Sequence, residues 1–531
     1  MADLLADWIA SPFGIGAIIG WTILTGIVTF WFSTRLSVDP GNNQGDIVRR
    51  VFRNSMIPIV SQIMVRVVDL IVAIALLRLL GPTGNGQYAV AVVVWLYVKT
   101  ISDFGLSLLA TREVARDRST LNAIVGETTL FRWAVLLVTA IPVGIYVGAS
   151  LSANAMALES ALAIGLLYLS IVPASYSEAS NAALNGLERM EIAALINVGV
   201  STMRAPLAVG LGASALGVPG VALAALLTSL FSAVAFHRAL RSLVTLRPVW
   251  RIDRPRFTFY ARESWPLLVN SLLVSLFFRV DVFIIAAMQG DAALGIYDAA
   301  YKLINLITIV PAYAVLAVFP IMAQRAKDPL ALARAQRVTT YSLVIVAWVF
   351  VFSITALSDI AIQVLAGDAY LPEAAVLLRL LIWFAPISFI NGVFQYVLVA
   401  AGEQRRLVPA FLSAVTFNLI GNLALVPIYG TRASALLTVA TECVILGVLL
   451  MVVRKSTLNI NVPRTLSRTW RPTLSGVVAT LAALALRDQP FLALCLSSAV
   501  FMLLSLATGV IGTEEKELFR RLRARAESSP G

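Results

Sequence analysis

Residues 217–237 read GVPGVALAALLTSLFSAVAFH, a run without Asp, Glu, Lys or Arg that is long enough to cross a bilayer as a helix. With 59% hydrophobic and 13% charged residues and a mean hydropathy of +0.86, the 531-residue chain cannot be a soluble domain. The sequence therefore predicts an all-α, multi-pass membrane protein with about fifteen spans. Comparable runs lie at about 13–33, 55–77, 86–109, 127–150, 157–176, 191–212, 217–237, 264–288, 294–320, 338–357, 374–400, 408–428, 431–453, 470–487 and 490–511.

Basic residues gather in alternate breaks between these runs. The break at 238–263 is rich in Arg, whereas the breaks on the opposite side hold only Arg78, Arg432 and Arg487. Lys and Arg in short loops stay in the cytoplasm, so the fourteen spans from 55 to 511 begin and end there. We expect a plasma-membrane (cytoplasmic-membrane) protein with mostly short outer loops and an extreme N-terminus outside. Because topology accounts for the net charge of +12, no nucleic-acid partner is expected.

Several function classes lack the residues they need. The chain has no G-x-x-x-x-G-K-[ST] phosphate loop and no large outer loop for a glycan polymerase or ligase. His237 is the single histidine, and Cys443 and Cys495 lie in separate apolar runs. We therefore expect a transporter that is not an enzyme, with no metal site, disulfide or cofactor.

Two segments with the same order of residues indicate an internal repeat. Proline, arginine, aspartate and glycine follow one another in both, and the distance from the proline to the glycine is 28 residues from Pro58 and 29 from Pro266. Six spans separate the copies, so we predict two six-helix lobes related as parallel repeats, with two further C-terminal helices and one added N-terminal anchor helix. The predicted divisions are 1–54 (anchor and basic linker), 55–237 (first lobe), 238–263 (Arg-rich loop), 264–453 (second lobe), 454–511 (C-terminal helices) and 512–531 (basic tail).

Short motifs in both copies resemble one family. Residues 77–88 (LRLLGPTGNGQY), 102–106 (SDFGL) and 111–116 (TREVAR) are similar to the start of the polysaccharide transport proteins that flip lipid-linked oligosaccharides. Residues 279–281 (RVD) and 294–303 (LGIYDAAYKL) resemble the second lobe of that family. The resemblance spans roughly 50–455 and implies a V-shaped fold of the multidrug/oligosaccharidyl-lipid/polysaccharide (MOP) exporter superfamily. It also implies a polyprenyl-pyrophosphate-linked glycan as substrate and coupling to an ion gradient.

Charged residues inside the predicted spans are the candidate site. A charge there costs about 2.5–3.5 kcal/mol on insertion scales, and cations near the midplane suit a passing pyrophosphate. Carboxylates in the same spans are candidates for ion coupling or for pairing with these cations. Local pairs on one helix, Arg66 with Asp69 and Lys99 with Asp103, remain an alternative. The substrate-binding candidates are Arg279, Arg66, Lys302, Lys99 and Arg204. The coupling or pairing candidates are Asp69, Asp103, Asp281, Asp298 and Glu442.

The repeat-equivalent prolines Pro58 and Pro266 are expected to kink their helices near an inner gate. The function that fits these features is a flippase for a lipid-linked oligosaccharide that works by alternating access. Its expected partners are membrane lipid, a coupling ion (H⁺ or Na⁺) and the polymerase or chain-length proteins of a glycan pathway. A drug/cation antiporter of the same superfamily and a non-transporting component of a glycan assembly complex are the alternatives.

Overall fold

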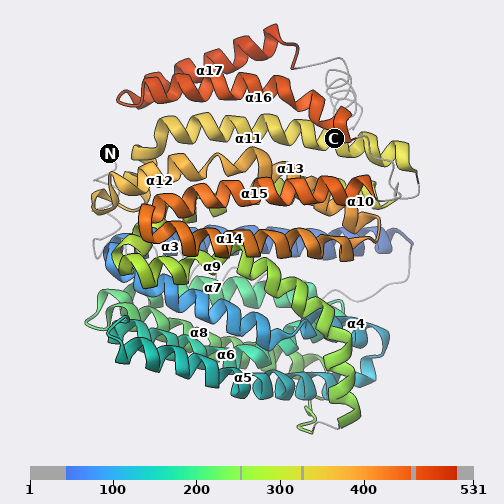
Figure 1. Ribbon diagram of the computed structural model, residues 1–531. Coiled ribbons are helices and arrows are strands. Elements are labelled where there is room, and N and C mark those ends of the chain that lie inside the picture. The colour runs from blue at the N-terminus through green and yellow to red at the C-terminus, as the bar shows by residue number, and fades with distance from the viewer. Residues whose placement is uncertain (1–43, 252–253, 325–327, 456–461, 511–531) are drawn as a thin grey trace. The chain divides into compact units, whose positions relative to one another are not determined.

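The computed structural model describes residues 44–251, 254–324, 328–455 and 462–510 (Figure 1). These ranges are helical and contain no β-strand. Among them, nine helices are long and apolar enough to cross a membrane, or ten if the bent pair Glu373–Leu381 and Phe384–Ala400 counts as one span. The all-α, multi-pass prediction is therefore confirmed. The predicted anchor helix at 13–33 and the basic tail at 512–531 lie outside the described residues.

The chain divides into two compact units, Met1–Asp298 and Ala299–Gly531. The first unit contains α3 (Gln44–Asp103), α4 (Leu106–Arg116), the 3-10 turn η1 (Arg118–Thr120), α5 (Leu121–Ser152), α6 (Leu158–Gly186), α7 (Met190–Ala213), α8 (Gly217–Leu243) and most of α9 (Arg254–Ile307). The second contains the end of α9, α10 (Ile309–Gln324), α11 (Pro329–Leu365), η2 (Asp368–Tyr370), α12 (Glu373–Leu381), α13 (Phe384–Ala400), η3 (Gln404–Leu407), α14 (Val408–Tyr429), α15 (Thr431–Arg454), α16 (Val462–Ala485) and α17 (Pro490–Ala507).

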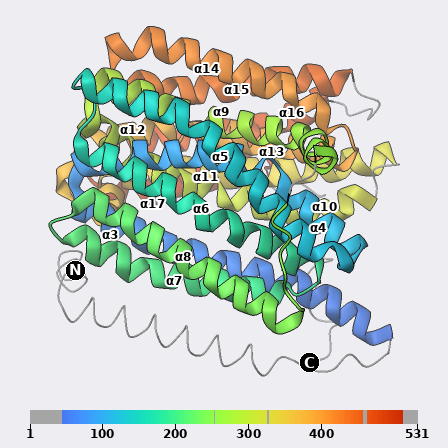
Figure 2. The same cartoon turned by 90° about the horizontal axis from the view of Figure 1, so that it is seen from below.

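In the first unit, α6 packs against α8, and α7 packs against both α3 and α8 (Figures 1 and 2). Small side chains let these helices approach, with Ala205, Ala208 and Ala224 buried beside Val72 and Leu76. The opposite surfaces are apolar. Large exposed side chains form one stripe along α5, as expected for a face in contact with lipid. The stripe consists of Leu137, Val138, Ile141 and Ile145.

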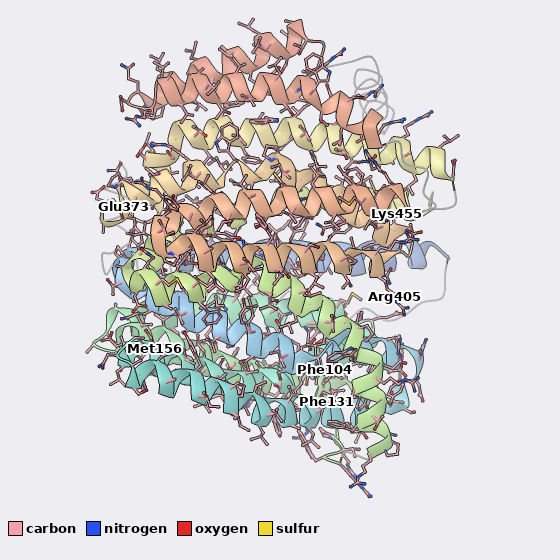
Figure 3. All side chains as sticks on the ribbon, viewed as in Figure 1. Phe104, Phe131, Met156, Glu373, Arg405 and Lys455 are labelled. Atoms are coloured by element: carbon pink, nitrogen blue, oxygen red, sulfur yellow. The ribbon has the colours of Figure 1, made fainter. Side chains whose placement is uncertain are left out.

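In the second unit, α14 packs on α15, and α16 packs on both α11 and α17. Trp348 of α11 lies against Gly476 of α16 and donates a hydrogen bond to the hydroxyl of Thr473 at 3.3 Å. Figure 3 shows Arg405 and Lys455 at one end of this unit and Glu373 at the other. The two basic breaks therefore share an end, as the alternating basic pattern requires.

Single glycines interrupt α3 and α9, each of which joins two runs that the sequence predicts as separate helices. Gly81 has φ 64° and Gly290 has φ 83°, in the region that favours glycine. The two glycines hold equivalent places in the repeat. The connections expected between these runs are thus single-residue turns, because glycine adopts a positive φ without steric cost and needs no longer loop. The backbone at Pro58 and Pro266 is helical, and the kinks expected at these two prolines stay a prediction.

The glycines that follow these breaks bring two helices into backbone contact. A Cβ atom on Gly86 would overlap the carbonyl oxygen of Asp291, and one on Gly295 would overlap that of Pro82. Asn85 donates a hydrogen bond from its side-chain amide to the carbonyl oxygen of Gly295 at 2.9 Å. The repeat motifs GQY and GIY therefore meet each other, and their glycines permit the close approach.

We expect Gly86→Ala and Gly295→Ala to lower the melting temperature of the purified protein, because each methyl group would push on backbone. Overpacking of this kind costs about 1–3 kcal/mol, more than the helix propensity of about 1 kcal/mol that alanine gains over glycine. Gly144→Ala is the matched control, since open space surrounds Gly144 within α5. Thermal unfolding in detergent measures the difference. Equal melting temperatures in all three variants would contradict the tight crossing.

Candidate functional site

Four charged side chains from three helices form one network in the first unit. Lys99 of α3 lies 2.9 Å from Glu178 of α6, measured from Nζ to Oε1. Arg132 of α5 donates from Nη2 to Oδ1 of Asp103 at 2.8 Å, and its Nε lies 4.0 Å from Oε2 of Glu178. The hydroxyl of Ser107 donates to Oδ1 of Asp103 at 2.6 Å. Two cations and two carboxylates thus balance each other where an isolated charge would be costly.

The turn between α3 and α4 creates part of this geometry. Phe104 and Gly105 have φ 52° and 79°, so α3 stops at Asp103 and α4 leaves in a new direction. Phe104 then packs edge-to-face on Phe131 with 5.3 Å between the ring centroids. Figure 3 labels both residues. The turn places Ser107 of α4 beside Asp103. The sequence predicts one continuous span over 86–109. This prediction is wrong at its end, because the turn at Phe104 and Gly105 separates α4 from α3.

Two polar cavities open beside the network. The larger has a volume of about 420 Å³ and the smaller about 200 Å³, and Lys99 and Glu178 line both. Hydroxyl and amide side chains make up much of the remaining polar lining, which suits contacts with sugar hydroxyls as well as with ions. The larger cavity is also lined by Asp103, Ser107, Thr111, Asn181 and Asn185. The smaller is also lined by Ser177, Asn197, Arg204, Thr228 and Ser232.

Asp69 pairs with Arg204 of α7, not with the neighbouring Arg66 on its own helix. The Arg66 side chain is exposed and has no ion pair or hydrogen bond with the residues that the structure describes. Its neighbours Ile63 and Val67 are exposed as well. The guanidinium group of Arg66 thus lies on an exposed face of α3, where a ligand could contact it.

Arg279 lies across the α9 break from its partner. It donates from Nη1 to Oδ1 of Asp298 at 3.1 Å, and the amide of Asn85 reaches the other carboxylate oxygen at 3.5 Å. Asp281 accepts a hydrogen bond of 2.6 Å from the hydroxyl of Tyr297. Both predicted aspartates are therefore buried and partnered inside the first unit.

The remaining candidates lie in the second unit. Lys302 is half-buried near the end of α9. Glu442 is buried on α15, and its carboxylate accepts a hydrogen bond of 2.7 Å from the amide of Asn391. On α14, the amide of Asn418 donates to Thr441 at 3.2 Å, and that of Asn422 donates to Asn418. The Glu442 contact thus joins α13 to α15, and a second buried polar contact at the neighbouring Thr441 joins α14 to α15. We refer to Glu442 and Asn391 as the Glu442 cluster.

Glu178 and Arg132 are the site residues that sequence reasoning missed. The predicted span ends at 176, which leaves Glu178 in a break, whereas α6 continues to Gly186. Arg132 is expected to reach the membrane surface, but its side chain is fully buried. Its partner Asp103 comes from another helix, so no spacing within one helix could reveal the pair. For the same reason Lys99 pairs with Glu178 and not with Asp103, four residues away.

No grouping of three or more His, Cys, Asp and Glu side chains with a geometry suited to a metal ion occurs in the described part of the chain. The balanced charges instead give a site that can exchange one ionic partner for another. A ligand anion can replace a carboxylate beside Lys99, and a ligand cation can replace Lys99 beside Glu178. Geometry alone thus allows transport of either charge.

Comparisons with family models show which families the sequence resembles. A model of the polysaccharide biosynthesis protein family matches residues 51–325, and a model of the MatE family matches residues 266–424. A search of curated proteins gives no significant match.

Solved structures resemble this chain over most of their length. The lipid II flippase MurJ in an inward closed conformation has a TM-score of 0.67 and 13% identity, covering 85% of this chain and 98% of MurJ. An inward-facing multidrug resistance MATE transporter of the MOP superfamily has a TM-score of 0.59 and 15% identity, with coverages of 74% and 95%. A eukaryotic MATE transporter has a TM-score of 0.54 and 14% identity, with coverages of 80% and 99%.

At such low identities these likenesses establish the fold alone, which this chain shares with MurJ and the MATE transporters. The family is established separately, because the polysaccharide biosynthesis model spans more than half of the sequence. The chain therefore belongs to the polysaccharide biosynthesis protein family.

Proposed function

We propose that the chain is a flippase that moves a polyprenyl-pyrophosphate-linked oligosaccharide across the cytoplasmic membrane by alternating access, for surface polysaccharide synthesis. The family match and the transporter fold support this function. The observation that carries it is the Lys99–Glu178 pair, which lines two polar cavities inside a membrane-spanning unit. An anionic headgroup that enters either cavity can therefore contact the Lys99 ammonium group directly.

Exchange of partners keeps the cost of substrate entry low. Lys99 is already desolvated on one side by Glu178, so a pyrophosphate oxygen that replaces the carboxylate changes the partner and not the burial of the ammonium group. Arg132 lies within 4.0 Å of Glu178 and can hold this carboxylate while Lys99 is engaged. Arg204 lines the adjoining cavity and extends the cationic path. Amides such as Asn181 and Asn185 supply hydrogen bonds to sugar hydroxyls.

Arg66 and Arg279 complete the proposed anion path on α3 and α9. Arg66 has an exposed guanidinium group, and Arg279 is held by Asp298. A guanidinium group presents parallel N–H donors that match two phosphate oxygens, which makes arginine the stronger ligand for a pyrophosphate. Lys302 remains a proposed further contact.

Coupling to an ion is proposed for the Glu442 cluster in the second unit. The side-chain oxygens of Asn391 and Asn422 are buried and, among the described residues, have no hydrogen-bond donor. The Asn391 oxygen and the carboxylate of Glu442, two residues joined by a hydrogen bond, offer oxygen ligands to Na⁺, and the carboxyl group alone can bind H⁺. The ion gradient would then bias one conformation of the transporter through this cluster.

A drug/cation antiporter is the second candidate. Asp103 and Glu178 line the larger cavity beside the single cation Lys99, and the MatE model matches part of the chain. The two functions predict opposite effects of removing the lysine charge, because a cationic drug gains from that change and a pyrophosphate loses. A polymerase or chain-length protein as partner fits the flippase alone.

Arg66→Ala and Arg279→Ala should each reduce glycan export by about tenfold or more, since a lost charge contact of about 1.4 kcal/mol or more is worth at least that factor. Surface glycan in a deletion strain carrying each variant measures the effect. The control is Arg432→Ala, an exposed arginine at the start of α15. Normal surface glycan in both single variants would rule out this anion path.

Lys99→Gln and Arg132→Gln should separate binding from folding. The Arg132 side chain is fully buried, so its loss leaves Asp103 and Glu178 without their shared counter-charge and should destabilise the protein by about 3–5 kcal/mol. The Lys99 side chain is 36% exposed, so Lys99→Gln should fold and lose export. Thermal unfolding and surface glycan are measured together. Drug efflux that rises in Lys99→Gln, with export unchanged, would favour the antiporter.

Glu442→Gln should keep the hydrogen bond from Asn391 and abolish stimulation by an ion gradient, because the amide neither binds a proton nor carries charge. Translocation of a labelled lipid-linked glycan in vesicles, with H⁺ and Na⁺ gradients imposed in turn, measures this stimulation. Glu373→Gln, at an exposed helix start, is the control. A variant with wild-type stimulation would remove Glu442 from coupling.

A further inference from the structure

Residues 244–251, here named the strap, leave α8 and run as extended chain across the first unit. Asn122 of α5 holds them through the backbone. Its carbonyl oxygen accepts a hydrogen bond from the amide of Val249 at 3.0 Å, and its side-chain oxygen accepts one from the amide of Arg247 at 2.9 Å. Its side-chain amide donates to the carbonyl oxygen of Thr245 at 3.2 Å. The backbone of Val249 lies so close to Gly126 that a side chain there would overlap it.

An aromatic stack fixes the end of the strap. The Trp250 ring lies parallel to that of Trp133, with 5.6 Å between centroids and 9° between planes. Its other neighbour is Tyr176, whose centroid is 6.3 Å away. Trp250 is nevertheless 50% exposed, and Val249 is 41% exposed. The strap is therefore held in place while apolar surface faces outward.

The first turns of α9 are held in the same way. The buried carboxylate of Glu127 accepts hydrogen bonds of 2.7 Å from both Arg256 and the hydroxyl of Tyr260. Phe257 stacks on Phe131 with 4.6 Å between centroids. Phe259, on the same turn, is 43% exposed. These contacts leave Arg254 and Phe259 facing outward on a fixed helix.

The charge of this surface is strongly one-sided. Residues 244–259 contain four arginines and one aspartate. Arg256 pairs with Glu127, and Arg247, Arg251 and Arg254 are exposed, as Arg256 is. Exposed aromatic and apolar side chains alternate with these arginines along the segment.

Two environments fit this mixture poorly. Water disfavours a fixed row of exposed Trp, Val and Phe side chains, and hydrocarbon disfavours arginine. The headgroup region of a bilayer accommodates both, because aromatic rings lie at that level and anionic phosphates attract basic residues. We propose that the strap and the first turns of α9 bind the headgroups of acidic phospholipids in the adjoining leaflet. This inference does not depend on the transported substrate.

The test is binding of phosphatidylglycerol to the purified full-length protein in detergent, counted by native mass spectrometry and followed by thermal unfolding. Wild type should bind it more tightly than phosphatidylcholine and should melt at a higher temperature in its presence. Arg247→Gln combined with Arg254→Gln should weaken binding by about 25-fold, since each juxtamembrane basic residue contributes about fivefold. The backbone contacts of the strap remain in this variant, so its melting temperature without lipid should match wild type.

Arg432→Gln combined with Arg487→Gln removes the same charge from the ends of other helices and should bind phosphatidylglycerol as wild type does. Inorganic phosphate should not raise the melting temperature. Equal binding of the two lipids by wild type, or undiminished binding of phosphatidylglycerol by the strap variant, would overturn the proposal. A response to inorganic phosphate as large as that to the lipid would do the same.

Discussion

A charge inside a bilayer is costly without a counter-charge, and three charged side chains of α3 in the first unit have such a partner. This helix supplies Asp69, Lys99 and Asp103, whose partners come from α7, α6 and α5. Each ion pair joins two different helices, so it fixes their relative position as well as neutralising a charge. Apolar packing between helices has no such direction in lipid, where hydrocarbon is as good a neighbour as leucine. The pairs that join α3 to α6 and α7 also contribute Lys99, Glu178 and Arg204 to the lining of the polar cavities.

The internal repeat has a structural counterpart at two levels. Gly81 and Gly290 break their helices at equivalent places, and Gly86 and Gly295 then meet in a reciprocal backbone contact. The repeated sequence therefore encodes a turn and a close crossing, which are properties of backbone. The charged partners differ between the copies, because Asp69 pairs with another helix while Asp281 accepts from Tyr297. A duplicated framework thus carries two different sets of polar contacts.

Much of the fold could be predicted from the sequence, because apolar runs of spanning length and alternating basic breaks are local patterns. The one-residue turns at Gly81 and Gly290, each of which separates two helices, could not, since a short polar break does not reveal how long the connection is. For the candidate site, the sequence predicted which charged residues lie inside the spans, but not which of them pair. Spacing on one helix suggested Lys99 with Asp103, but Glu178 on α6 is the partner. Pairing between helices depends on tertiary packing, which a single sequence does not specify.

The docking of the strap also bears on how this protein can be manipulated. The segment between α8 and α9 is the longest predicted inward loop, so it is the natural place for an epitope, a protease site or a reporter used to map topology. Asn122 forms hydrogen bonds with the backbone at three strap positions, and the backbone of Val249 packs directly against Gly126. An insertion there would remove these contacts together. Labelling reagents would also reach its backbone less readily than its loop character suggests, so weak labelling at this segment would not show that it faces outward.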